Sequence, residues 1–261
     1  MDVDLVFRNC RFASSHNQTP GGVAIQGGKI VAVATDAALP RGRQEIDGAG
    51  KVLLPGILDT HVHLRDPGAI HKEDFATGTR GAAVGGITTL LDMPNTAPPI
   101  TTAERLREKA EILARRSYVH YGLYAVITAR NIEAIPALAR EGAVGFKLFM
   151  TPPPQGDLPC PDDGAILEAM RRTAETGLPF GAHAENASIV DAATAALKQR
   201  GRTDPAAHSE ARPSLAEVES IARLIRFARA TRCRLHIYHL TTAEGVELVR
   251  QAKADGLPVT A

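Results

Sequence analysis

The feature that most constrains the fold is a regular alternation of short apolar segments with longer amphipathic segments, which begins after residue 51. Short apolar segments bounded by turn residues are typical of buried strands, and the segments between them are typical of helices. Such an alternation predicts parallel strands joined by right-handed crossovers. The predicted strands are Val52–Leu58, Ile87–Asp92, Val119–Ile127, Ala143–Phe149, Leu178–His183, Arg234–His239 and a start at Leu257.

Two α/β architectures fit this pattern, an open doubly wound sheet and a (β/α)8 TIM-type barrel. The seven strand starts favour the barrel, which would be incomplete here because only about six to seven of its strands lie in the sequence. Three pairs of residues have the spacing of capping boxes at helix starts: Thr101 and Glu104, Ser214 and Glu217, and Thr241 and Glu244. Pro136 predicts a helix that starts late or is kinked.

The first part of the chain has a different pattern. Val23–Ile25 and Lys29–Val33 flank Gly27 and Gly28, a dipeptide that can supply the positive φ angles of a tight hairpin turn. We therefore predict a small β-rich unit over residues 1–51 and a barrel domain over residues 52–261.

Charge and cysteine content argue against a nucleic-acid-binding protein, a membrane-binding protein and a disulfide-rich secreted protein. Lys and Arg number 30 and Asp and Glu number 29, so no overall field favours nucleic acid or a membrane as a partner. Cys10, Cys160 and Cys233 are far apart, which fits a reducing compartment better than a disulfide framework. We find no signal peptide and no apolar stretch of the roughly 18 to 20 residues that span a bilayer. We expect a cytoplasmic protein that acts on a small molecule, and homo-oligomer formation stays open.

Two histidines, His61 and His63, come directly after the first predicted barrel strand. Residues two apart on an extended chain point to the same face, so both imidazoles should be directed to the C-terminal end of that strand. Taken alone, the pair could equally be two polar loop histidines.

Lys147 lies in the segment VGFKLFM, which is otherwise apolar. Burial disfavours an ammonium group and lowers its pKa. In the simplest interpretation the side chain extends to the end of its strand and reaches water. In the alternative interpretation the neutral amine adds carbon dioxide, and the resulting carbamate is an anionic oxygen ligand that can bridge two metal ions.

His183 and His239 each end a predicted strand, and either could be an ordinary core histidine. With His61, His63 and Lys147, however, they fall at the ends of the first, fourth, fifth and sixth strands. In a barrel these ends meet at one mouth, where active sites are built. Four imidazoles and a bridging anion predict a binuclear Zn²⁺ site. The remaining histidines are predicted to face away (His236) or to lie on the surface (His16, His71, His120 and His208).

Four segments together resemble the dihydroorotases: HVHLRDPG at 61–68, HKEDFATGT at 71–79, GGITT at 85–89 and MPNTAPP at 93–99. The resemblance is closest to members with a carbamylated lysine and covers essentially the whole chain. It implies a metal-dependent hydrolase barrel with a small N-terminal β-sandwich part, and two Zn²⁺ per subunit bridged by carbamylated Lys147. The implied metal ligands are His61, His63, Lys147, His183 and His239. Arg65 and Asn95 would bind the carboxylate of the substrate.

The implied activity is the reversible conversion of dihydroorotate to N-carbamoyl-L-aspartate in pyrimidine biosynthesis. An allantoinase or a hydantoinase-type cyclic amidohydrolase is the alternative, and a non-catalytic homologue that serves as a scaffold is a second one. The family's catalytic aspartate, on an eighth strand, would lie beyond Ala261, so we assign no catalytic acid or base here. The run from Asp162 to Gly164 is predicted to cap a helix that begins near Ala165.

Overall fold

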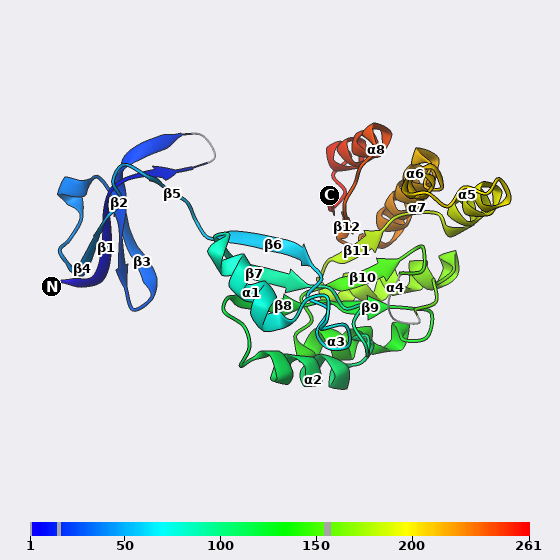
Figure 1. The fold of residues 1–261 in the computed structure, drawn as a ribbon, viewed down its shortest axis with the longest axis horizontal. Coiled ribbons are helices and arrows are strands. Elements are labelled where there is room, and N and C mark those ends of the chain that lie inside the picture. Colours follow the sequence, from blue (N-terminus) through cyan, green and yellow to red (C-terminus); the bar gives the residue numbers. More distant parts are fainter. Residues whose placement is uncertain (1, 15–16, 154–157) are drawn as a thin grey trace. The chain divides into compact units, whose positions relative to one another are not determined.

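The computed structural model describes residues 2–14, 17–153 and 158–261. The chain divides into two compact units, Met1–Gly56 and Ile57–Ala261 (Figure 1). No helix in the described ranges has the length and apolar character needed to cross a membrane.

The first unit is a five-stranded sheet in which β1 is central. Its strands are β1 Val3–Ala13, β2 Gln18–Gln26, β3 Lys29–Ala34, β4 Gly42–Asp47 and β5 Val52–Leu53. β1 pairs antiparallel with β2 and parallel with β4 and β5, and β2 pairs antiparallel with β3. A short 3-10 helix, Asp36–Ala38, precedes β4. Gly27 and Gly28, with φ of 58° and 73°, form the predicted turn between β2 and β3.

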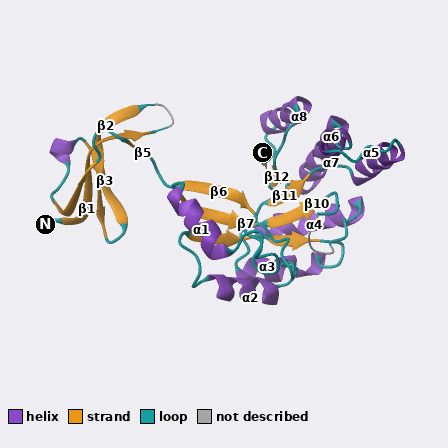
Figure 2. Ribbon diagram, in the orientation of Figure 1, coloured by secondary structure: helices purple, strands orange, loops and turns teal. Residues whose placement is uncertain are grey.

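The second unit alternates strands with helices, as predicted (Figure 2). Its strands are β6 Ile57–Val62, β7 Ile87–Asp92, β8 His120–Leu123, β9 Ala125–Ile127, β10 Phe146–Phe149, β11 Phe180–His183, β12 Leu235–Ile237 and β13 Val259–Thr260. Its helices are α1 Phe75–Val84, α2 Ala103–Leu113, α3 Ile135–Glu141, α4 Asp163–Thr176, α5 Ala187–Gln199, α6 Pro205–Glu210, α7 Ser214–Thr231 and α8 Ala243–Ala254, with a 3-10 turn at Ile132–Ala134 before α3. Leu90, Phe146 and Phe180 on the strands pack with Ile221 of α7 in one continuous apolar core.

The strands of this unit form two parallel sheets, β6-β7-β8 and β13-β12-β11-β10-β9. Tyr124 alone separates β8 from β9, so the single predicted strand Val119–Ile127 contributes to both sheets. Within the described residues, the outer strands β6 and β13 have one neighbouring strand each, and the sheets do not close into a barrel. The parallel α/β class is confirmed, whereas a closed barrel is not seen among the described residues.

The boundaries of the first predicted barrel strand were wrong. Val52–Leu53 pairs with β1 in the first unit, and β6 begins only at Ile57. Pro55 and Gly56 separate the two segments because a proline cannot donate to a ladder and glycine weakens a strand. As a result His61 lies within β6 and not after it.

The predicted caps were only partly right. The N-caps of α2 and α8 are Thr102 and Thr242, each one residue later than predicted. Ser214 is the first residue of α7 and makes no capping bond, because Pro213 takes the N-cap position. Pro136 lies in the first turn of α3, where a missing backbone N–H costs nothing, so the prediction of a late start is confirmed.

Candidate active site

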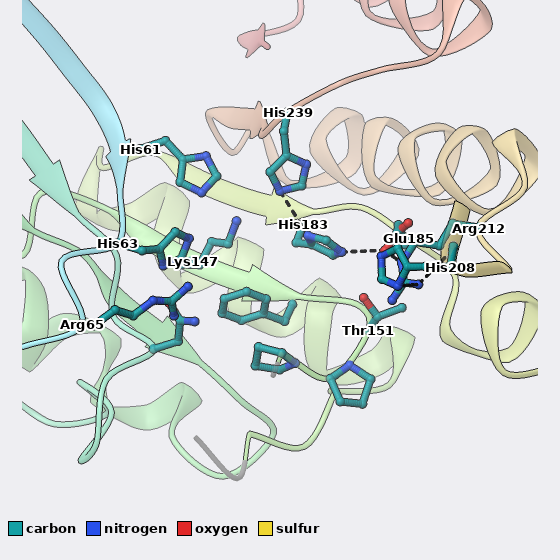
Figure 3. A pocket seen from close by; sticks show the side chains of 14 residues that line it. His61, His63, Arg65, Lys147, Thr151, His183, Glu185, His208, Arg212 and His239 are labelled. Carbon is teal, nitrogen blue, oxygen red and sulfur yellow. Dashed lines mark hydrogen bonds and ion pairs between the residues drawn. The ribbon is translucent and has the colours of Figure 1, made fainter. Parts of the chain in front are cut away.

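All seven residues singled out from the sequence line one pocket of about 300 Å³ in the second unit (Figure 3). They are His61, His63, Arg65, Asn95, Lys147, His183 and His239. They come from β6, β10 and β11 and from the segments that follow β6, β7 and β12. Because the strands of both sheets run parallel, their C-terminal ends lie on the same side of the unit, which explains why residues so far apart in sequence share a pocket.

The four histidines form a chain of neighbouring rings. The ring centroids of His61 lie 5.3 Å from those of His63 and of His239, and those of His183 and His239 are 4.7 Å apart. His183 Nδ1 is 3.1 Å from His239 Nε2. His61 and His63 point to the same side of the chain, as the two-residue spacing predicts.

The imidazoles of His61, His63 and His239 are neutral at pH 7. Burial, followed by the positive charge of Lys147, lowers the pKa of His61 to about 3. Burial and Arg65 lower the pKa of His63 to about 4, and burial with His183 lowers that of His239 to about 4. A neutral imidazole has a free lone pair, which is the form that binds a metal ion.

Lys147 lies inside β10 and is only 1% exposed. Its Nζ has no hydrogen-bond partner among the described residues, and it lies 3.9 Å from the ring centroid of Tyr238. Burial lowers the pKa of this amine to about 7, so a large fraction is uncharged at neutral pH. A buried, unpaired and partly neutral amine is the state from which a carbamate can form.

The donor set fits a zinc centre in its chemistry. Within the described part of the chain, no three His, Cys, Asp or Glu side chains already have the arrangement of a metal-binding group. In the structure His183 contacts His239 through one ring nitrogen, at 3.1 Å, and Glu185 through the other, at 2.8 Å. The ligand roles of the histidines and of Lys147 stay a prediction.

Of the two polar residues predicted to bind substrate, Arg65 lies on the opposite side of the pocket from Glu185 (Figure 3), and Asn95 also lines the pocket. Arg65 has a left-handed backbone, with φ of 59°, and its side chain lines the pocket. Asn95 is 2% exposed, and its Oδ1 has no well-aligned hydrogen-bond partner among the described residues, although the Asn95 side chain lies close enough to His63 to oppose the fall in the pKa of that imidazole. A buried acceptor of this kind is costly unless a ligand or water supplies a donor.

Sequence reasoning missed the far wall of the pocket, where Glu185, Arg212 and His208 lie. Glu185 Oε2 lies 2.8 Å from His183 Nε2 and 3.5 Å from Arg212 Nε. His208 was predicted to be a surface residue; it is exposed, but its Nδ1 lies 3.2 Å from Arg212 and the residue lines the pocket. Glu185 could have been found, because it follows His183 by two residues at the end of a strand. His208 lies in α6 and Arg212 follows that helix. The pattern of strand ends, on which the site prediction was based, does not indicate where this helix lies.

Two other predictions can be compared with the structure. Asp162 accepts the N–H of Ala165 at 2.8 Å and caps α4, as predicted, while Asp163 pairs with Arg223 at 2.6 Å. His236 does not line the pocket, and its Nδ1 is 2.8 Å from the hydroxyl of Thr260.

The second unit thus combines a parallel α/β fold with a pocket of histidines at the C-terminal ends of its strands. The family model described as dihydro-orotase-like matches residues 50–245, and the chain belongs to this family. It is similar to an allantoinase of Deinococcus radiodurans, with 34% identity over all of this chain and 58% of the relative. An allantoinase of Streptomyces avermitilis is 38% identical over 99% of this chain and 58% of the relative.

Solved structures agree with this assignment. The L-hydantoinase (dihydropyrimidinase) from Arthrobacter aurescens superimposes with a TM-score of 0.92 at 34% identity, covering 98% of this chain and 57% of that one. A D-hydantoinase superimposes with a TM-score of 0.87 at 27% identity, covering 98% of this chain and 56% of that one. The chain therefore spans somewhat over half the length of the relatives that it matches.

Proposed function

We propose that this chain is part of a zinc-dependent hydrolase that opens the ring amide of a hydantoin or of allantoin. The observation that carries the proposal is the pocket in which His61, His63, His183 and His239 surround the buried amine of Lys147. Neutral imidazoles and an oxygen anion are ligands that zinc prefers. The similarity to proteins named allantoinase and L-hydantoinase supports the cyclic amide as the substrate class.

This proposal replaces dihydroorotase, the main expectation from the sequence motifs. The family model is dihydro-orotase-like, but the relatives described above carry the names allantoinase and hydantoinase. The motifs HVHLRDPG and MPNTAPP therefore indicate the family and not this activity. Pyrimidine biosynthesis is no longer the favoured context.

Each residue of the pocket has a separate role in this proposal. Zinc held by the four histidines and by carbamylated Lys147 would supply Lewis acidity and a water-derived nucleophile at neutral pH. Asn95 Oδ1 would accept a ring N–H of the substrate, which satisfies the unpartnered acceptor in the wall. Glu185 would hold the ring of His183 through its hydrogen bond.

Dihydroorotate stays the second candidate substrate because Arg65 lines the pocket. A guanidinium offers paired donors that match a carboxylate. Dihydroorotate carries such a ring carboxylate, whereas hydantoin and allantoin do not.

The test uses the natural polypeptide that contains residues 1–261 and compares its activity on three substrates. Zinc content is measured first, and ring opening of allantoin, hydantoin and L-dihydroorotate is then followed. We expect about two zinc ions per chain, the number in a binuclear site, and faster turnover of allantoin or hydantoin than of dihydroorotate. Faster turnover of dihydroorotate than of allantoin and hydantoin would favour dihydroorotate as the substrate. A protein without zinc and without turnover would support the scaffold alternative.

A further inference from the structure

A buried ion pair lies next to the segment that carries His63 and Arg65. Lys109 Nζ is 2.5 Å from Asp92 Oδ2, and the two side chains are 3% and 0% exposed. Asp92 is the last residue of β7, and Lys109 lies in α2 on its buried face. Because removing two charges from water is costly, such a pair adds little net stability, and its presence needs another explanation.

The second oxygen of Asp92 holds the neighbouring backbone. Asp92 Oδ1 accepts the N–H of Leu64 at 3.0 Å, and Leu64 stands between His63 and Arg65. The N–H of Met93 also donates to the carbonyl of Val62, at 2.8 Å. The end of β7 thus fixes the chain where it leaves β6.

Arg65 needs this restraint because its φ of 59° lies in the left-handed region, which side chains with a Cβ adopt only at a cost. On the following side, the N–H of Ala69 donates to the carbonyl of Arg65 at 2.9 Å. With Leu64 held by Asp92, the chain is fixed on both sides of Arg65.

Neither Asp92 nor Lys109 lines the pocket, so both act at a distance from any ligand. We propose that they are a positioning pair. Lys109 orients the Asp92 carboxylate, which fixes the N–H of Leu64 and thereby directs His63 and Arg65 into the pocket. The inference rests on the proposed function for the use of His63 and Arg65, but its tests do not need turnover.

Two double variants, each without the charges of Asp92 and Lys109, distinguish the hydrogen bond to Leu64 from the charges of the pair as the cause of any effect. Asp92→Leu with Lys109→Met removes the acceptor for Leu64 and makes the pair apolar, a change that proteins often tolerate. Asp92→Asn with Lys109→Gln also removes both charges, but it keeps an oxygen for the N–H of Leu64 and a hydrogen-bonding group at 109. Arg107→Met is the matched control, because Arg107 lies on the same helix and pairs with Glu141 at the surface.

The readouts are zinc affinity and hydrogen–deuterium exchange in the peptide covering residues 61–68. We expect the Leu/Met variant to bind zinc about 10- to 100-fold more weakly, as is typical when a group that orients a ligand is lost. Exchange at Leu64 should accelerate in this variant. The Asn/Gln variant and Arg107→Met should keep wild-type affinity and slow exchange.

Wild-type zinc affinity in a folded Leu/Met variant would overturn the proposal, and so would an equal loss in the folded Asn/Gln variant. Slow exchange at Leu64 in the unaltered protein is required whether or not the variants fold. If this amide exchanges as fast as those of the exposed residues Ile70 and His71, the proposal is wrong. Zinc binding without hydrolysis of any cyclic amide would contradict the proposed function and leave this inference standing.

Discussion

At the scale of single residues, Lys147 distinguishes a metal centre from an ordinary cluster of histidines. If its carbamate bridges two metal ions, Lys147→Ala should remove most of the bound zinc and abolish turnover in the natural polypeptide. Zinc per chain is measured by elemental analysis. Lys253→Ala, at an exposed position on α8, is the control and should bind zinc as the wild type does. Unchanged zinc stoichiometry in Lys147→Ala would show that the amine is not a ligand.

Arg65 is the residue that should decide between ring substrates. Loss of a buried charge-assisted pair typically costs about 2–5 kcal/mol, so Arg65→Met should reduce kcat/KM for dihydroorotate by well over tenfold. Hydantoin and allantoin lack the ring carboxylate and should lose much less. An equal loss on all three substrates would mean that Arg65 only maintains the fold of its loop.

The sequence predicted these residues because their signals are local. His61 and His63 share a face by strand geometry, and Lys147 stands out in an apolar segment. The far wall was missed because Arg212 and His208 reach the pocket only through the packing of α6. No periodicity in the sequence reports a contact of that kind.

At the scale of elements, the helix starts provide a direct comparison of sequence and structure. The sequence pattern assigns the cap of α2 to Thr101, whereas in the structure Thr102 accepts the N–H of Arg105 at 3.3 Å. Thr102→Ala should therefore lower the free energy of unfolding by about 0.5–2 kcal/mol. Thr101→Ala, the neighbouring control, should have a smaller effect. Urea unfolding of both variants gives the comparison, and a larger loss in Thr101→Ala would favour the sequence pattern.

The type of each element could be predicted, but several boundaries could not. Alternation and apolar content identify the strands, whereas their ends depend on which neighbour they pair with. Val52 and Leu53 continue an apolar run in the sequence, yet they pair with β1. Tyr124 interrupts a predicted strand only because the strands on its two sides belong to different sheets.

At the scale of the whole molecule, β6 is an edge strand of a sheet that is open on one side. Ile57 and Leu58 on this strand are 49% and 65% exposed. An unpaired edge with apolar side chains invites aggregation, and in a barrel it would be covered by a neighbouring strand. The parallel α/β class followed from alternation, but closure depends on pairing between distant strands, which no local pattern specifies.

Residues 1–261 by themselves should accordingly be poorly soluble and inactive on cyclic amides. An extended polypeptide that supplies β6 with a second neighbour should recover both solubility and turnover. Light scattering and a ring-opening assay on the two proteins test this. Robust zinc-dependent turnover by monomeric residues 1–261 would contradict the expectation.

The break at Tyr124 has a consequence for how the molecule holds together. It leaves His61, His63, Arg65 and Asn95 with the three-stranded sheet, and Lys147, His183 and His239 with the five-stranded sheet. A cation bound by both sets would link the two sheets to each other, in addition to the apolar core that they share. Chelation should then lower the denaturant concentration at which this unit unfolds, and added zinc should raise it again. In this molecule the ion would stabilise the folded state as well as take part in the chemistry.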